Sequence, residues 1–104
     1  MSESDSDTKI VLLPEIDEET TEPPMYKVLL FNDDFTTKEF VVQILMDVFG
    51  KDQAEAVQLM WRVHHNGVGV AGIYPLEIAE TKVKVVKMTA RESGFPLKLT
   101  LEKE

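Results

Sequence analysis

The chain has 104 residues, of which 43% are hydrophobic and none is cysteine, and its formal net charge is −8. This length is enough for one small hydrophobic core, so we expect a single globular domain. The absence of cysteine excludes disulfides, thiolate metal sites and cysteine nucleophiles.

Most of the negative charge lies at the N-terminus. Residues 1–24 contain eight acidic residues and one lysine, whereas residues 25–104 are nearly neutral. Apart from the short run "IVLLP", the N-terminal segment has too little apolar surface to offset the entropy that ordering would cost. We therefore predict a disordered acidic tail over residues 1–24 and one folded domain over residues 25–104.

The charge pattern also limits the partners and the location of the protein. No stretch is basic enough to neutralise the phosphates of a nucleic acid, so we expect no nucleic-acid binding. The N-terminus lacks the basic and apolar regions of a signal peptide, and no stretch is long and apolar enough for a membrane span. These features favour a cytoplasmic protein that does not bind a membrane.

The domain begins with a predicted strand and a predicted helix. Residues 26–31, "YKVLLF", are rich in residues that suit a strand. Thr36 and Glu39 have the spacing of a capping box, in which each side chain satisfies a free backbone amide at a helix N-terminus. Apolar residues then recur at helical spacing up to Phe49, and Gly50 ends the helix.

A second helix and a second strand follow. Asp52 and Glu55 form another predicted capping box, and the helix runs to Asn66 and Gly67. The stretch "GVGVAGIY", residues 67–74, is typical of a strand whose glycines mark a bend or a close approach of the backbone. One stripe of the second helix is expected to contain Val57, Met60, Trp61 and His64.

The C-terminal part has the pattern of a helix and then a strand. Pro75 suits the start of a helix, because its missing amide would be unpaired there. This helix is expected to end at Gly94, and its predicted buried face consists of Leu76, Ala79, Val83, Val86 and Ala90. Residues 97–102, "LKLTLE", alternate as a strand does, with the three leucines facing inward.

The predicted elements follow the order β-α-α-β-α-β without an internal repeat. Three short strands and three helices indicate the α+β class, in the form of an α/β sandwich. We expect a three-stranded antiparallel sheet with the helices packed mainly on one of its faces.

The stretch "NDD" places three polar side chains, Asn32, Asp33 and Asp34, between the first strand and the first helix. Such residues often only turn the chain, and Asp34 would also suit the cap of the next helix. Their spacing does not match a calcium-binding loop. From these residues alone, a turn and a binding site both remain open.

His64 is a further polar candidate, and Met60 lies one helical turn before it. The two side chains can line one concavity with an apolar floor and a polar rim. An ordinary core role for His64 also remains open. His65 points about 100° away from His64 on a helix, so the pair cannot easily hold one metal ion. We therefore predict no metal site.

Motifs for catalysis are missing from the sequence. It contains neither an "HExxH" motif nor a glycine-rich phosphate loop after a strand. An Asp–His pair is available for acid–base work, but no nucleophile or cofactor site accompanies it. We therefore expect no enzymatic activity and no cofactor.

Four stretches in order resemble the ClpS family: "MYKVLLFNDDFTTKEFV", "QLMWRVHHNGVGVAG", "EIAETKVKVV" and "FPLKLTLEKE". Members of this family are bacterial adaptors that deliver substrates with N-degrons, which are destabilising N-terminal residues, to a Clp AAA+ unfoldase and its protease. The resemblance runs from about Met25 to the C-terminus and so covers the predicted domain.

The resemblance implies a binding site for the free α-amino group of a substrate. Asn32, Asp33 and His64 would accept its hydrogen bonds, with a secondary role for Asp34. Near neutral pH this group is mostly an ammonium, which has three donors and no acceptor. A charge-assisted bond contributes about 1.5–3 kcal/mol, which separates a chain terminus from an internal peptide nitrogen.

The resemblance also implies a pocket for a large hydrophobic first side chain, namely Leu, Phe, Tyr or Trp. Val41, Met60 and Leu97 would line this pocket, and Lys38 would stand at its mouth. Family members carry a methionine at this last position, where it is associated with the exclusion of β-branched first residues. We therefore expect this protein to admit Ile and Val termini more readily.

For delivery, the resemblance places the docking of the unfoldase at Glu77, Glu80 and Lys82, in the segment "EIAETK". The partner would be the N-terminal domain of a ClpA-type or ClpC-type unfoldase, and the adaptor would act as a monomer. The tail resembles the tails of the family in kind and would engage the unfoldase during delivery. An alternative is a module of the same fold that modulates the unfoldase without recognising N-termini.

Overall fold

The structure, a computed structural model, describes residues 23–104. In this range the order is β1 (Met25–Phe31), α2 (Lys38–Asp47), α3 (Gln53–Asn66), β2 (Val68–Pro75), α4 (Leu76–Glu92) and β3 (Lys98–Lys103). The predicted order of elements and the predicted α+β class are confirmed. The tail predicted over residues 1–24 lies outside the described residues, apart from its last two prolines.

The three strands form an antiparallel sheet in the order β2-β1-β3, so β1 is the central strand. Leu30 of β1 lies opposite Gly69 of β2. Between Val28 and Leu29 the register with β2 shifts, which is a β-bulge. Gly72 lies opposite Val28 at this irregularity, so the bend predicted from the glycines is present.

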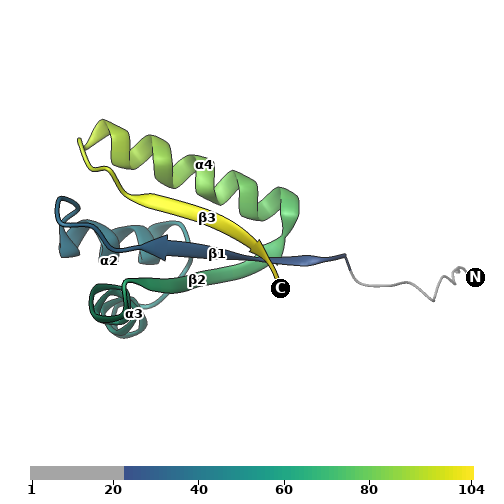
Figure 1. Cartoon of the computed structure of the whole chain (residues 1–104), viewed down its shortest axis with the longest axis horizontal. Helices are drawn as coiled ribbons and strands as arrows, with labels where there is room; N and C mark the ends of the chain where they lie inside the picture. Colours follow the sequence, from purple (N-terminus) through teal and green to yellow (C-terminus); the bar gives the residue numbers. More distant parts are fainter. Residues whose placement is uncertain (1–22) are drawn as a thin grey trace, which may run out of the picture.

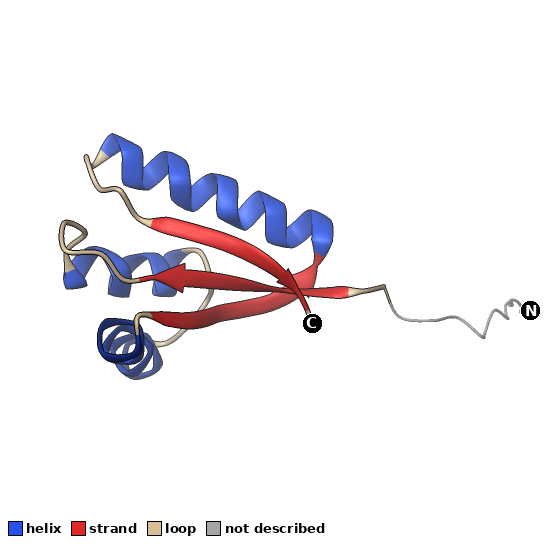
Figure 2. Ribbon diagram, in the orientation of Figure 1, coloured by secondary structure: helices blue, strands red, loops and turns tan. Residues whose placement is uncertain are grey.

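The helices cover one face of the sheet. Val28 and Leu30 of β1 point to the covered face and are buried, whereas Val68 and Val70 of β2 are exposed. Because strand residues alternate between the two faces, this burial pattern places the helices on one face, as predicted. Figure 1 shows α4 lying along the sheet, with α2 and α3 together at the end of β1. The loop that leaves β1 lies at this same end (Figure 2).

The structure corrects the predicted start of the first helix. The N-cap is Thr37 and not Thr36, since the Thr37 hydroxyl accepts a hydrogen bond from the backbone N–H three residues later at 3.1 Å. Thr36 has another partner, because its hydroxyl donates to Oδ2 of Asp33 at 2.7 Å. The capping box of Asp52 and Glu55 at the start of α3 is present as predicted.

The buried stripe of α3 also differs from the prediction. Trp61 is 42% exposed, and His64 is exposed as well. Met60 is buried, so the predicted stripe and the observed stripe share this residue. Helical spacing alone does not show how far a helix is rotated about its axis against its neighbours. The buried residues of α3 are Ala56, Leu59, Met60 and Val63.

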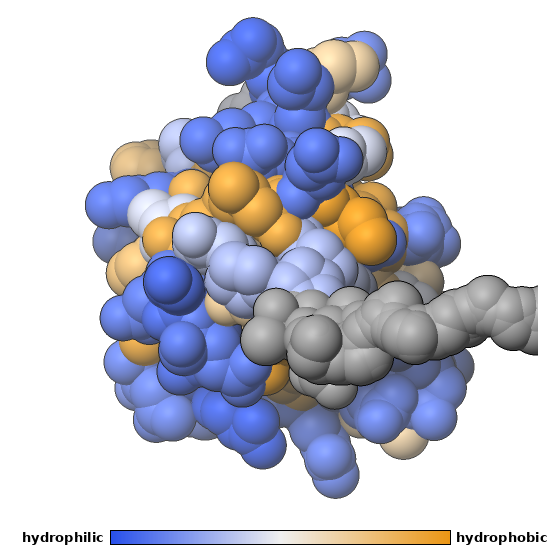
Figure 3. Space-filling view, turned by 90° about the vertical axis from the view of Figure 1, so that its right-hand side faces the viewer, coloured by the Kyte–Doolittle hydropathy of each residue, from blue (hydrophilic) through white to orange (hydrophobic). Residues whose placement is uncertain are grey.

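The buried face of α4 agrees with the prediction except at Leu76, which is exposed, and at Val83, which is only partly buried. Leu76 is exposed at the junction of β2 and α4, which lies at the right-hand end of Figure 1. Hydrophobic side chains form a band on the face of the molecule seen from that end (Figure 3). Leu76, in the first turn of α4, adds to the apolar surface at this end of the molecule. The buried residues of α4 are Ala79, Val86 and Ala90.

Candidate functional site

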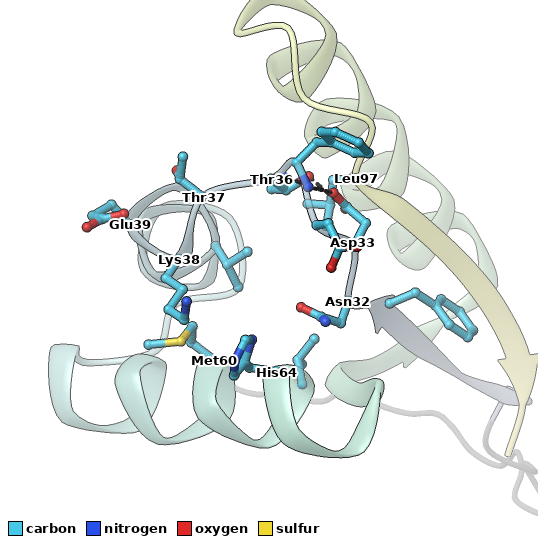
Figure 4. Close-up of a pocket in the computed structure, with 14 residues that line it drawn as sticks. Asn32, Asp33, Thr36, Thr37, Lys38, Glu39, Met60, His64 and Leu97 are labelled. Carbon is cyan, nitrogen blue, oxygen red and sulfur yellow. Dashed lines mark hydrogen bonds between the residues drawn. The ribbon is translucent and has the colours of Figure 1, made fainter.

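A cavity of about 380 Å³ opens at the end of β1. Its walls come from the loop after β1, from α2 and α3, and from the segment before β3 (Figure 4). Residues that are far apart in the sequence meet there, because β1 directs the following loop toward α3. Of the residues singled out in the sequence, the cavity brings together Asn32, Asp33, Asp34, Lys38, Val41, Met60, His64 and Leu97.

Asp33 fixes the shape of the loop between β1 and α2. Its Oδ1 accepts hydrogen bonds from the backbone N–H groups of Phe35 at 2.8 Å and Thr36 at 2.7 Å. Its Oδ2 accepts the Thr36 hydroxyl at 2.7 Å. Asp33 therefore does turn the chain. A carboxylate offers about four acceptor positions, so one position remains for a further donor.

The same hydrogen bonds keep Asp33 charged. Partial burial raises the pKa of its carboxyl, but the bonds from the Thr36 hydroxyl and from the two backbone amides together outweigh this, so the pKa lies below its ordinary value. Hydrogen bonds to the charged form of a carboxyl favour that form. Asp33 is thus an anion at neutral pH and suits a cationic ligand group.

Asn32 and His64 face the cavity from two elements, the end of β1 and α3 (Figure 4). The backbone N–H of Asn32 donates to the carbonyl oxygen of Gly67 at 2.9 Å, which ties the end of β1 to the C-terminus of α3. Gly67 has a φ of 87°, a conformation that glycine adopts without strain and that ends the helix. This junction holds Asn32 close to the last turn of α3, which carries His64.

The apolar walls of the cavity come from Val41 of α2, Met60 of α3 and Leu97 just before β3. All three side chains are buried and belong to the hydrophobic core. Core packing and cavity lining are therefore two roles of the same side chains, and the core fixes the position of the walls. Met60 is an adaptable wall, because its unbranched thioether fits aliphatic and aromatic guests.

Lys38 is exposed at the mouth of the cavity and extends from α2 toward Met60 (Figure 4). Its Nζ lies 5.7 Å from the ring centroid of Trp61. Trp61 in turn contacts His64, with ring centroids 5.7 Å apart. The sequence predicted Trp61 on one stripe with Met60 and His64 but not its contact with Lys38. The available signal was its position three residues before His64.

The three residues predicted to dock the unfoldase lie on α4 and do not line the cavity. Glu77 and Glu80 are exposed. Lys82 is only partly exposed, because its Nζ donates to the carbonyl oxygen of Val48 at 2.7 Å and lies 5.1 Å from the ring centroid of Tyr74. Lys82 therefore links α4 to the C-terminus of α2, where a cation is favourable. The sequence did not reveal this contact.

Three further observations concern the described part of the chain. Within residues 23–104, no group of three or more histidine, aspartate or glutamate side chains is arranged to hold a metal ion. The rings of His64 and His65 have centroids 5.3 Å apart and are inclined by 68°. No helix of this range is long and apolar enough to cross a membrane.

Comparisons with known proteins point to one family. Residues 21–100 match the family model of the "ATP-dependent Clp protease adaptor protein ClpS". A relative of that name from Myxococcus xanthus is 48% identical over 98 residues, which are 94% of this chain and 92% of the relative. Another from Desulforapulum autotrophicum is 58% identical over 82 residues, which are 79% of each chain.

A solved structure shows the same fold. The structure of Agrobacterium tumefaciens ClpS2 bound to L-phenylalaninamide matches with a TM-score of 0.76 and 40% sequence identity. The match covers 80% of this chain and 100% of that chain. The family predicted from the four sequence stretches is therefore confirmed, and the chain belongs to the ClpS family of ATP-dependent Clp protease adaptor proteins.

Proposed function

We propose that this protein is an adaptor that binds polypeptides with a free N-terminus and a hydrophobic first residue, namely Leu, Phe, Tyr or Trp. It delivers them to a Clp unfoldase and its protease for degradation. The observation that carries the proposal is the composition of one cavity, in which polar acceptors stand beside buried apolar walls. Such a site suits a ligand with a charged amino group next to an apolar side chain.

The ligand of a relative supports this proposal. L-phenylalaninamide, to which Agrobacterium tumefaciens ClpS2 is bound, has a free α-amino group and a phenyl side chain. Its carboxyl group is an amide, which stands in the position of the first peptide bond of a chain. It thus carries the chemical groups of an N-terminal phenylalanine. The sequence identity of 40% with that protein supports the same class of ligand for this chain.

The α-amino group would bind at the polar end of the cavity. Near neutral pH it is mostly an ammonium with three N–H donors. Asn32 offers its amide oxygen, Asp33 offers its charged carboxylate, and His64 offers a ring nitrogen. Asp34 lines the same cavity and has a secondary role. Hydrogen bonds to a charged group contribute about 1.5–3 kcal/mol each, which favours a terminus over an internal peptide nitrogen.

The first side chain would occupy the apolar part of the cavity, against Val41, Met60 and Leu97. The volume of about 380 Å³ lies within the range of small-molecule pockets. Lys38 stands at the mouth, where it limits the shape of the guest. Recognition of this kind makes and breaks no covalent bond, so the role we propose is non-enzymatic and needs no cofactor.

Delivery would use a second surface, on α4. Glu77 and Glu80 are exposed there and do not line the cavity. The N-terminal domain of a ClpA-type or ClpC-type unfoldase would dock on them and on Lys82 while a substrate occupies the cavity. Residues 1–24 would engage the unfoldase during delivery. In this proposal the adaptor acts as a cytoplasmic monomer.

Titration of two peptides tests the recognition of N-termini. One peptide begins with Phe and has a free α-amino group, and its twin is acetylated. We expect the twin to bind at least about tenfold more weakly, because acetylation removes the charge and two N–H donors. Equal affinity for both peptides would contradict the proposal. It would favour the alternative, a module of this fold that modulates the unfoldase without recognising N-termini.

A further inference from the structure

Trp61 is the common neighbour of two groups at the mouth of the cavity, although it does not line the cavity itself. The Nζ of Lys38 lies 5.7 Å from its ring centroid. The ring of His64 meets the indole edge-on, with centroids 5.7 Å apart and an angle of 79°. His65 stacks on the same indole at 5.6 Å and 20°. Trp61 thus connects a side chain of α2 with the last turn of α3.

Lys38 places a positive charge at the entrance of a site that we propose for a positive ligand group. A lysine ammonium free to move over the mouth would repel the α-ammonium of the substrate. In the structure, Lys38 extends toward Met60, whereas Asn32 and Asp33 lie on the other side of the cavity (Figure 4). The observed direction of Lys38 therefore keeps its charge away from Asn32 and Asp33, two of the three proposed acceptors of the α-ammonium.

The contact with Trp61 accounts for this direction. The face of an aromatic ring attracts a cation within about 6 Å of its centroid, and indole is the strongest of the natural rings in this respect. The observed 5.7 Å falls within that distance. At an exposed site, such a contact changes an equilibrium about two- to fivefold. This is enough to bias a flexible side chain toward one side of the mouth.

We infer that Trp61 is a positioning residue of the N-terminus site. It holds the Lys38 ammonium on the Met60 side of the mouth, away from Asn32 and Asp33. The inference rests on the proposed function, because it concerns the affinity for a charged N-terminus. It assigns to Trp61 an effect on this affinity through Lys38, without contact between Trp61 and the ligand.

A double-mutant cycle tests the inference. Trp61→Leu removes the aromatic ring, and Lys38→Met removes the charge but keeps an unbranched side chain. The probe is a fluorescent peptide that begins with Phe and has a free α-amino group. We expect Trp61→Leu to weaken binding about two- to fivefold when Lys38 is present, and to have little effect in the Lys38→Met background.

Ionic strength supplies a second readout, which a purely structural role of Trp61 would not change. Added salt should reduce the loss caused by Trp61→Leu, because exposed charges are screened over about 10 Å at 0.1 M salt. Trp61→Phe keeps an aromatic face and should retain most of the affinity. Lys84→Met is the matched control for Lys38→Met, since Lys84 is an exposed lysine on α4 that does not line the cavity.

Two results would overturn the inference. One is unchanged affinity in both Trp61→Leu and Trp61→Phe. The other is the same loss from Trp61→Leu in both backgrounds and at both ionic strengths. The proposed function fails in a different way, through equal binding of the free peptide and its acetylated twin by the unmutated protein. The two failures are therefore distinguishable.

Discussion

At the residue scale, Asp33 combines an observed structural role with a proposed binding role. Hydrogen bonds from Phe35 and Thr36 hold its carboxylate in place and lower its pKa against the effect of partial burial. These bonds also orient an acceptor before any ligand arrives. A ligand that binds an oriented acceptor does not have to pay the entropy of ordering it.

Substitution of single acceptors tests the polar end of the cavity. His64→Ala should weaken binding of a Phe-initiated peptide at least about tenfold, or about 1.4 kcal/mol, without lowering thermal stability, because the side chain is exposed. Asp33→Ala should weaken binding at least as much and should also loosen the loop. Calorimetric titration measures the affinity of both variants. His65→Ala is the control, because His65 does not line the cavity. Unchanged affinity in either folded variant would contradict its proposed role.

The pH dependence of binding follows from the charges of the two partners. The lowered pKa of Asp33 keeps its carboxylate charged throughout the neutral range. The hydrogen bonds of the loop lose their stabilising effect only in acid, as the pH falls from the ordinary pKa of aspartate through the lowered pKa of Asp33. The free α-amino group of the ligand has a pKa of about 7.7–8.0, and binding favours its charged form. Affinity should therefore fall at least about tenfold between about pH 7 and about pH 10. Titrations at both pH values that give equal affinity would contradict an ammonium-binding site.

Lys38→Met tests the mouth of the pocket. The contact with Trp61 stabilises Lys38 by about 0.5–1 kcal/mol, whereas ordering a lysine side chain costs up to about 2 kcal/mol. The aliphatic part of the Lys38 side chain is therefore only partly ordered at the mouth. We expect Ile and Val termini to bind within about tenfold of Leu. Lys38→Met should increase the discrimination by about 1–2 kcal/mol. Peptides that differ only in this first residue provide the measurement, and strong rejection of Ile and Val by the unmutated protein would contradict the prediction.

At the scale of elements, the local sequence predicted most of the fold. Strand alternation and one capping box depend on neighbours in the chain, and the six elements appear in the predicted order. The start of α2 was predicted one residue early, because Thr36 has a competing partner in Asp33 that spacing does not reveal. The exposed side of α3, with Trp61, depends on how this helix is rotated against the sheet.

The candidate site was predicted less completely. From the residues alone, the "NDD" stretch was compatible with a turn or with a site, and the choice of cavity residues came from the family resemblance. The contacts that were missed join long side chains to distant elements, as in Lys82 with Val48 and Lys38 with Trp61. Such contacts depend on how helices pack in space, so no local pattern encodes them.

Gly69 sets the approach of β2 to α3. A Cβ atom at this position would lie 2.8 Å from Cγ2 of Val63 and 3.2 Å from Cδ1 of Leu59. Gly69→Ala should therefore push α3 outward and lower the free energy of unfolding by about 1–3 kcal/mol. It should also weaken peptide binding, because α3 carries three residues that line the cavity, Met60, Val63 and His64. Urea unfolding and titration measure both, with exposed Val70→Ala as the control. A Gly69→Ala variant with unchanged stability and unchanged affinity would contradict this prediction.

At the scale of the whole molecule, the cavity and the exposed side of α4 are separate surfaces. Glu77 and Glu80 belong to α4 and do not line the cavity. Substrate binding and unfoldase docking should therefore respond to different mutations. Lys82 is less suitable for separating them, because it also donates a hydrogen bond to Val48.

Charge reversal on α4 tests this separation. Glu77→Lys combined with Glu80→Lys should strongly reduce degradation of a Phe-initiated reporter by the Clp unfoldase and protease. Peptide affinity should stay within about twofold, because both side chains are exposed and lie outside the cavity. Degradation assays and peptide titration of the same preparation give the two readouts. Normal degradation by the double variant would contradict docking at these residues.

The most direct measurement is a crystal structure of this protein with a peptide that begins with Phe. We predict that the α-amino nitrogen lies within about 2.7–3.2 Å of acceptor atoms of Asn32, Asp33 and His64. The phenyl ring should lie in the same cavity, against Met60 and Leu97. A peptide bound at another surface, or one whose α-amino nitrogen faces solvent away from these acceptors, would contradict the recognition of N-termini by this cavity.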